Sequence, residues 1–258
     1  MSKPRFYFPA PLQPHQNFEL PESVAHHALR VLRLKNGAEI VLFDGQGGEY
    51  AAQLECAGKH ATATTAAHNP REAELAGQIN LIQALATADK MDWIVEKAVE
   101  LGASRIVPVA AQRSVLHLRG DRLEKRLQHW RRVAQSASEQ CGRNRLMVVE
   151  RPCTVEQFLE QLEPKPVNLT LLCHPGYGIA LDQAIRNFVD EIASADSSDV
   201  PVLNLMIGPE GGWSESELAL ARQRGVNAIQ FGLRTLRTET AGLALIAAST
   251  ALLGWNSP

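Results

Sequence analysis

Cysteine is scarce in this chain and shows neither metal-binding nor disulfide spacing. The four cysteines, Cys56, Cys141, Cys153 and Cys173, are scattered and form no Cys-x-x-Cys pair. Zinc sites and disulfide frameworks need closely spaced or numerous cysteines. We therefore expect no metal, free and buried thiols, and a protein of the reducing cytoplasm.

Long hydrophobic runs and an excess of one charge are also missing. The longest apolar stretch, Ala241–Leu253, is too short to span a bilayer, and no apolar signal-peptide segment follows Lys3 and Arg5. The formal net charge is -2, and 45% hydrophobic with 21% charged residues is close to globular averages. We expect no membrane partner, and any basic surface must be local.

The familiar glycine-rich phosphate motifs are absent, but another glycine-rich loop is present. The apolar run Leu203–Ile207 ends in the loop Gly208–Gly212, and Ser214 with Glu217 forms a capping box for a following helix. Glycine lets backbone groups approach a ligand, and α/β proteins often bind ligands where strand, loop and helix N-terminus meet. Because Glu210 would repel phosphate, we expect a neutral or cationic ligand.

A second loop further along the chain repeats this layout. The predicted strand Ala228–Gly232 leads into a loop with Arg234 and Arg237, and an apolar helix begins near Glu239. Two such loops can form two walls of one pocket. Taken alone, each is equally compatible with a plain turn between strand and helix.

Together the two loops resemble the C-terminal motifs of the SPOUT class of RNA methyltransferases. More narrowly, the chain resembles the ribosomal RNA small subunit methyltransferase E family, over nearly its whole length. Each matching block is weak alone, but their ordered set is specific. The blocks are His26–Arg33, Leu42–Gly45, Glu96–Gly102, Glu139–Arg145, Ile207–Gly212 and Leu236–Ala241.

The resemblance implies both a fold and an activity. The expected fold is an N-terminal PUA-like β-barrel RNA-binding domain, residues 1–70, before a SPOUT-type α/β methyltransferase domain with a trefoil knot, residues 78–258. General topology rules would have argued against a knot. The implied activity uses S-adenosylmethionine to methylate N3 of a uridine in 16S rRNA of the small ribosomal subunit. A ribose 2′-O methyltransferase and a non-catalytic RNA-binding assembly factor remain alternatives.

The sequence pattern also predicts two domains. Short strands with tight turns at Asp44-Gly45 and Gly58-Lys59 are typical of a small barrel, and 68–77 is the expected linker. Beyond it, strand and helix patterns alternate, which predicts a mostly parallel sheet with helices on both faces. Predicted strands are 39–43, 49–56, 61–67, 79–85, 105–109, 147–150 and 169–173; predicted helices are 22–32, 89–101, 121–140, a short one from 154, and 180–193.

The resemblance places the methyl donor in three loops, which follow Leu172, Ile207 and Phe231. These three apolar residues and Leu236 are candidates to enclose the adenine ring, although each is equally compatible with a plain core position. The expected cofactor-binding residues are Leu172, Ile207, Gly208, Pro209, Glu210, Gly211, Gly212, Phe231, Gly232, Leu233, Leu236 and Arg237.

Uracil N3 carries a proton, so methylation needs a base that removes it or a cation that stabilises the anion. Arg237 and Arg143 are candidates for anion stabilisation or phosphate anchoring, and Glu239 and Glu139 are the candidate carboxylates. The alternatives are structural. Glu239 can complement a helix dipole or pair with Arg237, and Glu139 can be a solvated helix end.

Positive side chains bind phosphate without reading sequence. Those expected to contact RNA are Arg5, Arg30, Arg33, Lys35, Arg143 and Arg145.

The apolar segment Ala241–Leu253 predicts a homodimer. A helix with almost no polar face must be buried on most sides, and one sheet covers only one of them. Gly242, Ala244 and Ala248 would allow a second copy to approach closely, and a two-fold interface could bring Arg143 or Arg145 of one subunit near the donor of the other. The alternative is a monomer in which other helices cover this one.

Overall fold

The computed structural model describes residues 3–163, 165–195 and 197–256, and the chain divides into two compact units. One unit comprises the chain up to Glu74 together with Gln135–Leu146. The other comprises Leu75–Ala134 and the chain from Met147 onward. The first unit therefore includes a segment that the sequence pattern had assigned to the second domain.

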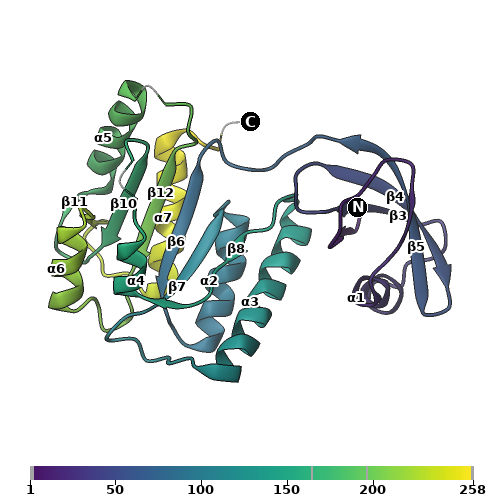
Figure 1. Ribbon diagram of the computed structural model, residues 1–258, viewed down its shortest axis with the longest axis horizontal. Helices are drawn as coiled ribbons and strands as arrows, with labels where there is room; N and C mark the ends of the chain where they lie inside the picture. Colours follow the sequence, from purple (N-terminus) through teal and green to yellow (C-terminus); the bar gives the residue numbers. More distant parts are fainter. Residues whose placement is uncertain (1–2, 164, 196, 257–258) are drawn as a thin grey trace. The chain divides into compact units, whose positions relative to one another are not determined.

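The first unit contains a five-stranded sheet in the order β1-β3-β4-β5-β2 (Figure 1). β1 is parallel to β3 and the remaining pairs are antiparallel. The three predicted strands are confirmed, whereas β1 and β2 were missed because three residues are too few to show a period. The bounds are β1 Arg5–Tyr7, β2 Asn17–Glu19, β3 Glu39–Phe43, β4 Glu49–Ala57 and β5 His60–Asn69.

Local residue choice explains the turn that follows β3 in this sheet. Asp44 Oδ1 accepts a hydrogen bond from Gln46 N at 3.1 Å, and Gly45 adopts a φ of +83°. A left-handed φ is cheap only for glycine. Within β3, Ile40 and Leu42 are fully buried, so alternate residues of the strand build the core of this unit.

The predicted helix 22–32 is confirmed in extent but changes character midway. α1 (Glu22–His26) continues as the π-helix η1 (His27–Val31), and Leu32 N donates to His27 O at 2.9 Å. Arg33 follows with a left-handed φ of +53°. The predicted linker 68–77 is wrong at its start, because β5 runs through Asn69.

The second unit is built on an eight-stranded sheet in which every pair is parallel, as predicted (Figure 1). The order is β11-β13-β10-β12-β6-β7-β8, and β9 also pairs with β7. The bounds are β6 Gln78–Ala84, β7 Arg105–Ala110, β8 Val148–Val149, β9 Cys153–Thr154, β10 Asn168–Cys173, β11 Ile179–Ala180, β12 Val202–Ile207 and β13 Asn227–Gln230.

Helices cover both faces of this sheet. Ile82 packs with the α4 and α6 side chains Phe158 and Ala221, whereas a Cβ on Gly242 of α7 would lie 3.1 Å from Leu81. Neighbouring strand residues point to opposite faces, so α7 lies on the side away from α4 and α6. No helix in the described part of the chain is long and apolar enough to cross a membrane. The helices are α2 Ala88–Glu100, α3 Gly120–Cys141, α4 Val155–Glu160, α5 Leu181–Ser194, α6 Glu215–Gln223 and α7 Thr238–Leu253.

Candidate ligand pocket of the parallel sheet

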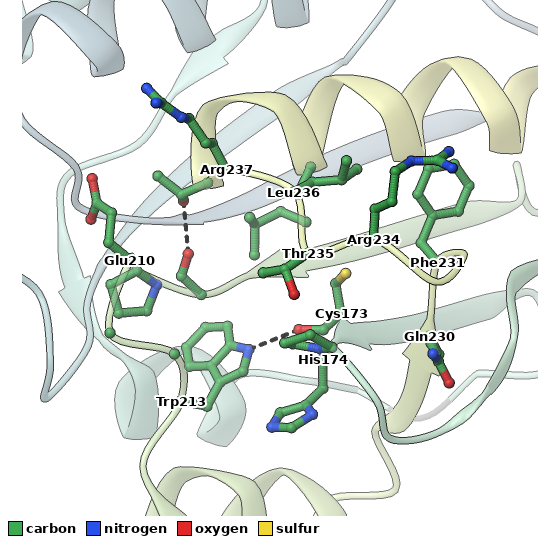
Figure 2. Close-up of a pocket in the computed structure, with 18 of the residues that line it drawn as sticks. Cys173, His174, Glu210, Trp213, Gln230, Phe231, Arg234, Thr235, Leu236 and Arg237 are labelled. Atoms are coloured by element: carbon green, nitrogen blue, oxygen red, sulfur yellow. Dashed lines mark hydrogen bonds between the residues drawn. The ribbon is translucent and has the colours of Figure 1, made fainter.

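A cavity of about 690 Å³ lies at the carboxyl ends of β10, β12 and β13 (Figure 2). Three loops line it: Cys173–Pro175 after β10, Gly208–Trp213 after β12, and Gln230–Arg237 after β13. The first turns of α2 and α7 complete the wall through Lys90 and Thr238. The glycine-rich loop after β12 and the arginine-containing loop after β13 thus line one pocket.

The loop after β12 is held by side chains that bind its backbone. Trp213 Nε1 donates to Cys173 O at 3.2 Å, which joins this loop to the one after β10 (Figure 2). Arg113 Nη1 donates to the carbonyl oxygens of Gly211 at 3.0 Å and Trp213 at 3.2 Å. A Cβ on Gly208 would lie 3.1 Å from Trp213 Nε1, so any larger residue there would have to displace the Trp213 ring slightly. The predicted capping box is also confirmed, since Glu217 N donates to Ser214 Oγ.

A buried pair of polar side chains connects this loop to α7. Thr238 Oγ1 donates to Gly208 O at 2.7 Å, and Gln83 Nε2 in turn donates to Thr238 Oγ1 at 2.9 Å. Gln83 is fully buried at the end of β6. No sequence motif pointed to Gln83, although a glutamine inside the apolar run of β6 is the kind of polar residue that needs a specific partner when buried.

The end of the pocket where α2 and α7 begin is charged. Lys90 Nζ lies 2.7 Å from Glu210 Oε1 and 3.2 Å from Glu239 Oε2. The hydrogen bond to Glu210 is the largest cause that raises the pKa of Lys90. The hydrogen bond to Glu239 and the charges of both carboxylates add to it and outweigh partial burial, which lowers the pKa. Burial raises the pKa of Glu210, but bonds from Lys90 and the backbone outweigh it, so the pKa lies below its usual value. Arg237 is 82% exposed, with Nη1 3.9 Å from Glu239 Oε1.

The pocket also has apolar lining residues, and these differ in part from the predicted ones. Ile207, Phe231 and Leu236 line the cavity. Leu172 does not, because β10 turns its side chain into the core shared with α4 and α6. Leu233 is 96% exposed and also lies outside the lining. Cys173 lines the pocket instead, and burial raises the pKa of its thiol to about 11, so the thiol stays neutral at physiological pH.

Glu139 and Arg143, the two other predicted catalytic residues, do not line this cavity. Glu139 Oε1 accepts a hydrogen bond from Tyr7 N at 3.0 Å. Arg143 is only 3% exposed, and its Nε donates to Glu74 Oε1 at 3.0 Å. Both contacts lie within the first unit. The sequence could not show them, because it does not reveal which residue Arg143 meets.

The predicted RNA-binding residues separate into bound and exposed groups. Arg5 is mostly buried and paired with Glu49, and Arg145 is half-exposed and lies 3.2 Å from Glu72. The exposed group comprises Arg30, Arg33 and Lys35, and no ion pair joins these residues to any carboxylate in the described ranges. No cluster of three or more His, Cys, Asp or Glu side chains in those ranges could hold a metal ion.

Comparisons with known proteins agree with this architecture. Residues 73–250 match the family model of the RNA methyltransferase domain, and residues 20–62 match that of the RNA methyltransferase PUA domain. A ribosomal RNA small subunit methyltransferase E from Synechocystis is 33% identical over 234 residues, which are 88% of this chain and 71% of the relative. Its Bacillus subtilis counterpart is 29% identical over 90% of this chain and 88% of the relative.

Two solved structures are similar over nearly their whole length. A Neisseria gonorrhoeae ribosomal RNA small subunit methyltransferase E bound to S-adenosylmethionine is 33% identical, covers 97% of this chain and 98% of its own, and has a TM-score of 0.84. A Legionella pneumophila protein in complex with the same cofactor is 28% identical, with coverages of 97% and 98% and a TM-score of 0.86. The resemblance inferred from the sequence is confirmed: this chain belongs to the ribosomal RNA small subunit methyltransferase E family.

Proposed function

We propose that this protein transfers a methyl group from S-adenosylmethionine to N3 of a uridine in 16S rRNA of the small ribosomal subunit. The observation that carries the proposal is the cavity of about 690 Å³ at the carboxyl ends of the parallel strands, inside a domain of the RNA methyltransferase family. Parallel α/β sheets bind ligands at these ends, and the volume is typical of cofactor sites.

The residues present suit this donor. Phe231, Leu236 and Ile207 supply apolar contacts for an adenine ring, and Glu210 supplies a carboxylate for a cationic ligand. Gly232 has a φ of +71°, and a Cβ there would point into open space, so its backbone remains accessible. Bound S-adenosylmethionine supplies a methyl group activated by a positively charged sulfur.

The protein's own task is to position the base and stabilise its anion. Arg237 is an exposed cation on the pocket wall, so it is placed to lower the pKa of the uracil N3–H group by stabilising the deprotonated ring. Glu239 is instead engaged within the pocket wall, because its Oε2 lies 3.2 Å from Lys90 Nζ. We therefore assign anion stabilisation to Arg237 and a positioning role to Glu239.

RNA binding by the first unit belongs to the same proposal. Arg30, Arg33 and Lys35 are exposed, and Val31 and Leu32 between them are 60% and 43% exposed. Exposed cations bind phosphate oxygens, and exposed apolar side chains next to them offer a surface for an unpaired base. Arg5 and Arg143 are withdrawn from this surface because carboxylates already bind them.

We also propose a homodimer through the outward face of α7. Leu245 is 1% exposed, and Gly242 contacts the chain's own β6, so the inward face needs no second copy. The opposite side carries Ala247, Ala251 and Leu252, which are exposed and apolar. A two-fold contact would bury this stripe against its own copy. Because Arg143 is buried, Arg145 is the arginine left to reach a neighbouring donor site.

Mass-spectrometric mapping of 16S rRNA from a strain that lacks the gene tests the proposed function. We expect one 3-methyluridine to disappear and to return with the wild-type gene but not with Arg237→Ala. Loss of a ribose 2′-O-methyl group instead would indicate the alternative methyltransferase. Unchanged modifications, together with no heat on titration with S-adenosylmethionine, would indicate an assembly factor.

A further inference from the structure

Lys90 on the pocket wall is bound by two carboxylates from different segments. Glu210 belongs to the loop after β12 and Glu239 to the first turn of α7, at 2.7 Å and 3.2 Å from Lys90 Nζ. All three side chains are partly buried, with exposures of 29%, 35% and 17% in the order Lys90, Glu210, Glu239. One ammonium therefore shares its charge between two anions at the edge of the cavity.

The wall around Glu210 is otherwise cationic. Among the described residues that line the cavity, Glu210 is the only carboxylate, whereas Lys90, Arg113, Arg234 and Arg237 are positively charged. A cationic ligand is therefore attracted by one group, and Lys90 already occupies an oxygen of that group. Any change in this ion pair alters how the pocket receives a positive charge.

The donor and its product differ in charge. S-adenosylmethionine carries a sulfonium, an ammonium and a carboxylate, which leaves one net positive charge near neutral pH. S-adenosylhomocysteine has lost the sulfonium charge with the methyl group and is neutral overall. Donor and product compete for the same pocket, so an enzyme that binds the charged donor more tightly than the neutral product is less inhibited by its product.

Resting on the proposed methyl donor, we infer that Lys90 is a specificity-determining residue. Lys90 sets how strongly the pocket prefers the positively charged donor over the neutral product. Its positive charge repels the donor, and its ion pair with Glu210 competes with the donor for that carboxylate. When Glu210 turns to a ligand cation, Glu239 still lies 3.2 Å from Lys90, so Lys90 itself keeps a carboxylate partner. Glu239 thereby lets Glu210 exchange partners.

The same helix provides a matched control. Lys97, seven residues later in α2, lies 2.7 Å from Glu96 and 2.7 Å from Glu100. Their hydrogen bonds raise its pKa, as happens for Lys90, but Lys97 does not line the cavity. Lys97→Met therefore removes the same kind of charge and ion pairs without touching the site.

The test is calorimetric titration of the full-length protein and its variants with three ligands. These are S-adenosylmethionine, S-adenosylhomocysteine and sinefungin, which keeps a positive charge near the sulfonium position but has no methyl group to transfer. We expect Lys90→Met to raise the ratio of donor affinity to product affinity by roughly three- to tenfold, because one nearby unit charge has about that effect at a partly exposed site. Glu210→Gln should lower the ratio by a similar factor.

Sinefungin should follow the donor, the changes should shrink at high salt, and Lys97→Met should leave the ratio unchanged. Thermal unfolding of each variant verifies folding, and Glu210→Gln tests the ratio even if Lys90→Met does not fold. The inference would be overturned if Lys90→Met lowered the affinity for all three ligands equally and Glu210→Gln left the ratio of donor to product affinity unchanged. Lys90 would then be a structural residue. Failure of the wild type to bind either donor or product would instead overturn the proposed function itself.

Discussion

At the residue scale, the pocket depends on polar side chains that bind backbone carbonyl groups. Thr238 and Arg113 donate to the carbonyl oxygens of Gly208 and Gly211, and Gln83 orients Thr238. Since these bonds restrict the loop, less conformational freedom is lost when a ligand binds. Gln83 and Arg113 lie outside the motifs recognisable in the sequence, because their partners are distant in the chain. Gln83 and Thr238 are 155 positions apart, and Arg113 and Gly211 are 98 positions apart.

Gln83→Leu tests this connection. The substitution removes the donor to Thr238, so we expect the free energy of unfolding to fall by about 1–2 kcal/mol and donor affinity to fall by about fivefold as the loop loosens. Urea unfolding and calorimetry measure the two effects. The control is Asn204→Leu, which breaks part-buried side-chain hydrogen bonds with Thr170 and Asn80 outside the pocket lining. Unaltered donor affinity in Gln83→Leu would show that Gln83 does not support the site.

Gly211→Val tests the loop itself. A Cβ at Gly211 would lie 3.1 Å from the Cβ of Arg113, so valine should push away the side chain that binds this loop. We expect donor affinity to fall by more than about tenfold while the protein stays folded, since the contact is local. Arg113→Ala should weaken donor binding through the same loop. Normal titration heat from folded Gly211→Val would show that the loop does not hold the donor.

At the scale of elements, η1 and α7 carry the two proposed contact surfaces. η1 ends with exposed Arg30 and Val31 and is followed by Arg33, whose left-handed φ of +53° is uncommon for a residue with a side chain. Such strained backbone often marks a functional segment. α7 is apolar, but the structure divides it into an inward face in the core and an outward face that includes small side chains.

Arg30→Ala combined with Arg33→Ala tests the RNA surface. Losing two phosphate contacts should weaken rRNA binding, most clearly at low salt, and lower the slope of log affinity against log salt by roughly two. Donor affinity should be unchanged. The control is Arg122→Ala with Lys125→Ala, two exposed cations of α3 in the second unit. A salt slope equal to that of the wild type would show that Arg30 and Arg33 do not contact RNA phosphates and are simply solvated.

Ala247→Glu tests the outward face of α7. We expect the wild type to have twice the 28.2 kDa mass of one chain in light scattering at micromolar concentration. A charge in the middle of an apolar two-fold contact is buried unpaired, so the variant should be a folded monomer. The control is Ala219→Glu, which introduces the same charge at an exposed position of α6. Leu245→Asp is unsuitable, because Leu245 belongs to the chain's own core. A monomeric wild type would contradict the dimer and the shared site.

At the scale of the whole molecule, the fold determines where the chemistry lies. Because all strands of the second unit are parallel, the loops after β10, β12 and β13 leave the sheet at one edge and form one pocket. The segment with Glu139 and Arg143 belongs to the first unit instead. The trefoil knot implied by the family resemblance stays a prediction.

The sequence by itself determined the elements and the family. The spacing of hydrophobic residues, the capping residues and the turn glycines are local properties of the sequence. They therefore predicted β3, α2 and the capping box at Ser214 and Glu217 nearly to the residue. The ordered motif blocks identified the RNA methyltransferase family, which the comparisons confirm. Strands too short to show a period, such as β1 and β11, could not be predicted from the sequence pattern.

Only the tertiary structure decided which charged residues meet. Arg143, Glu139 and Arg237 are all catalytic candidates in the sequence, but Arg143 is buried beside Glu74, whereas Arg237 is exposed on the pocket wall. Lys90 carries no motif at all, yet it binds both carboxylates at the pocket edge. The physical reason is that the strength of an ionic contact depends on distance and burial, which follow from folding segments distant in the chain onto one sheet.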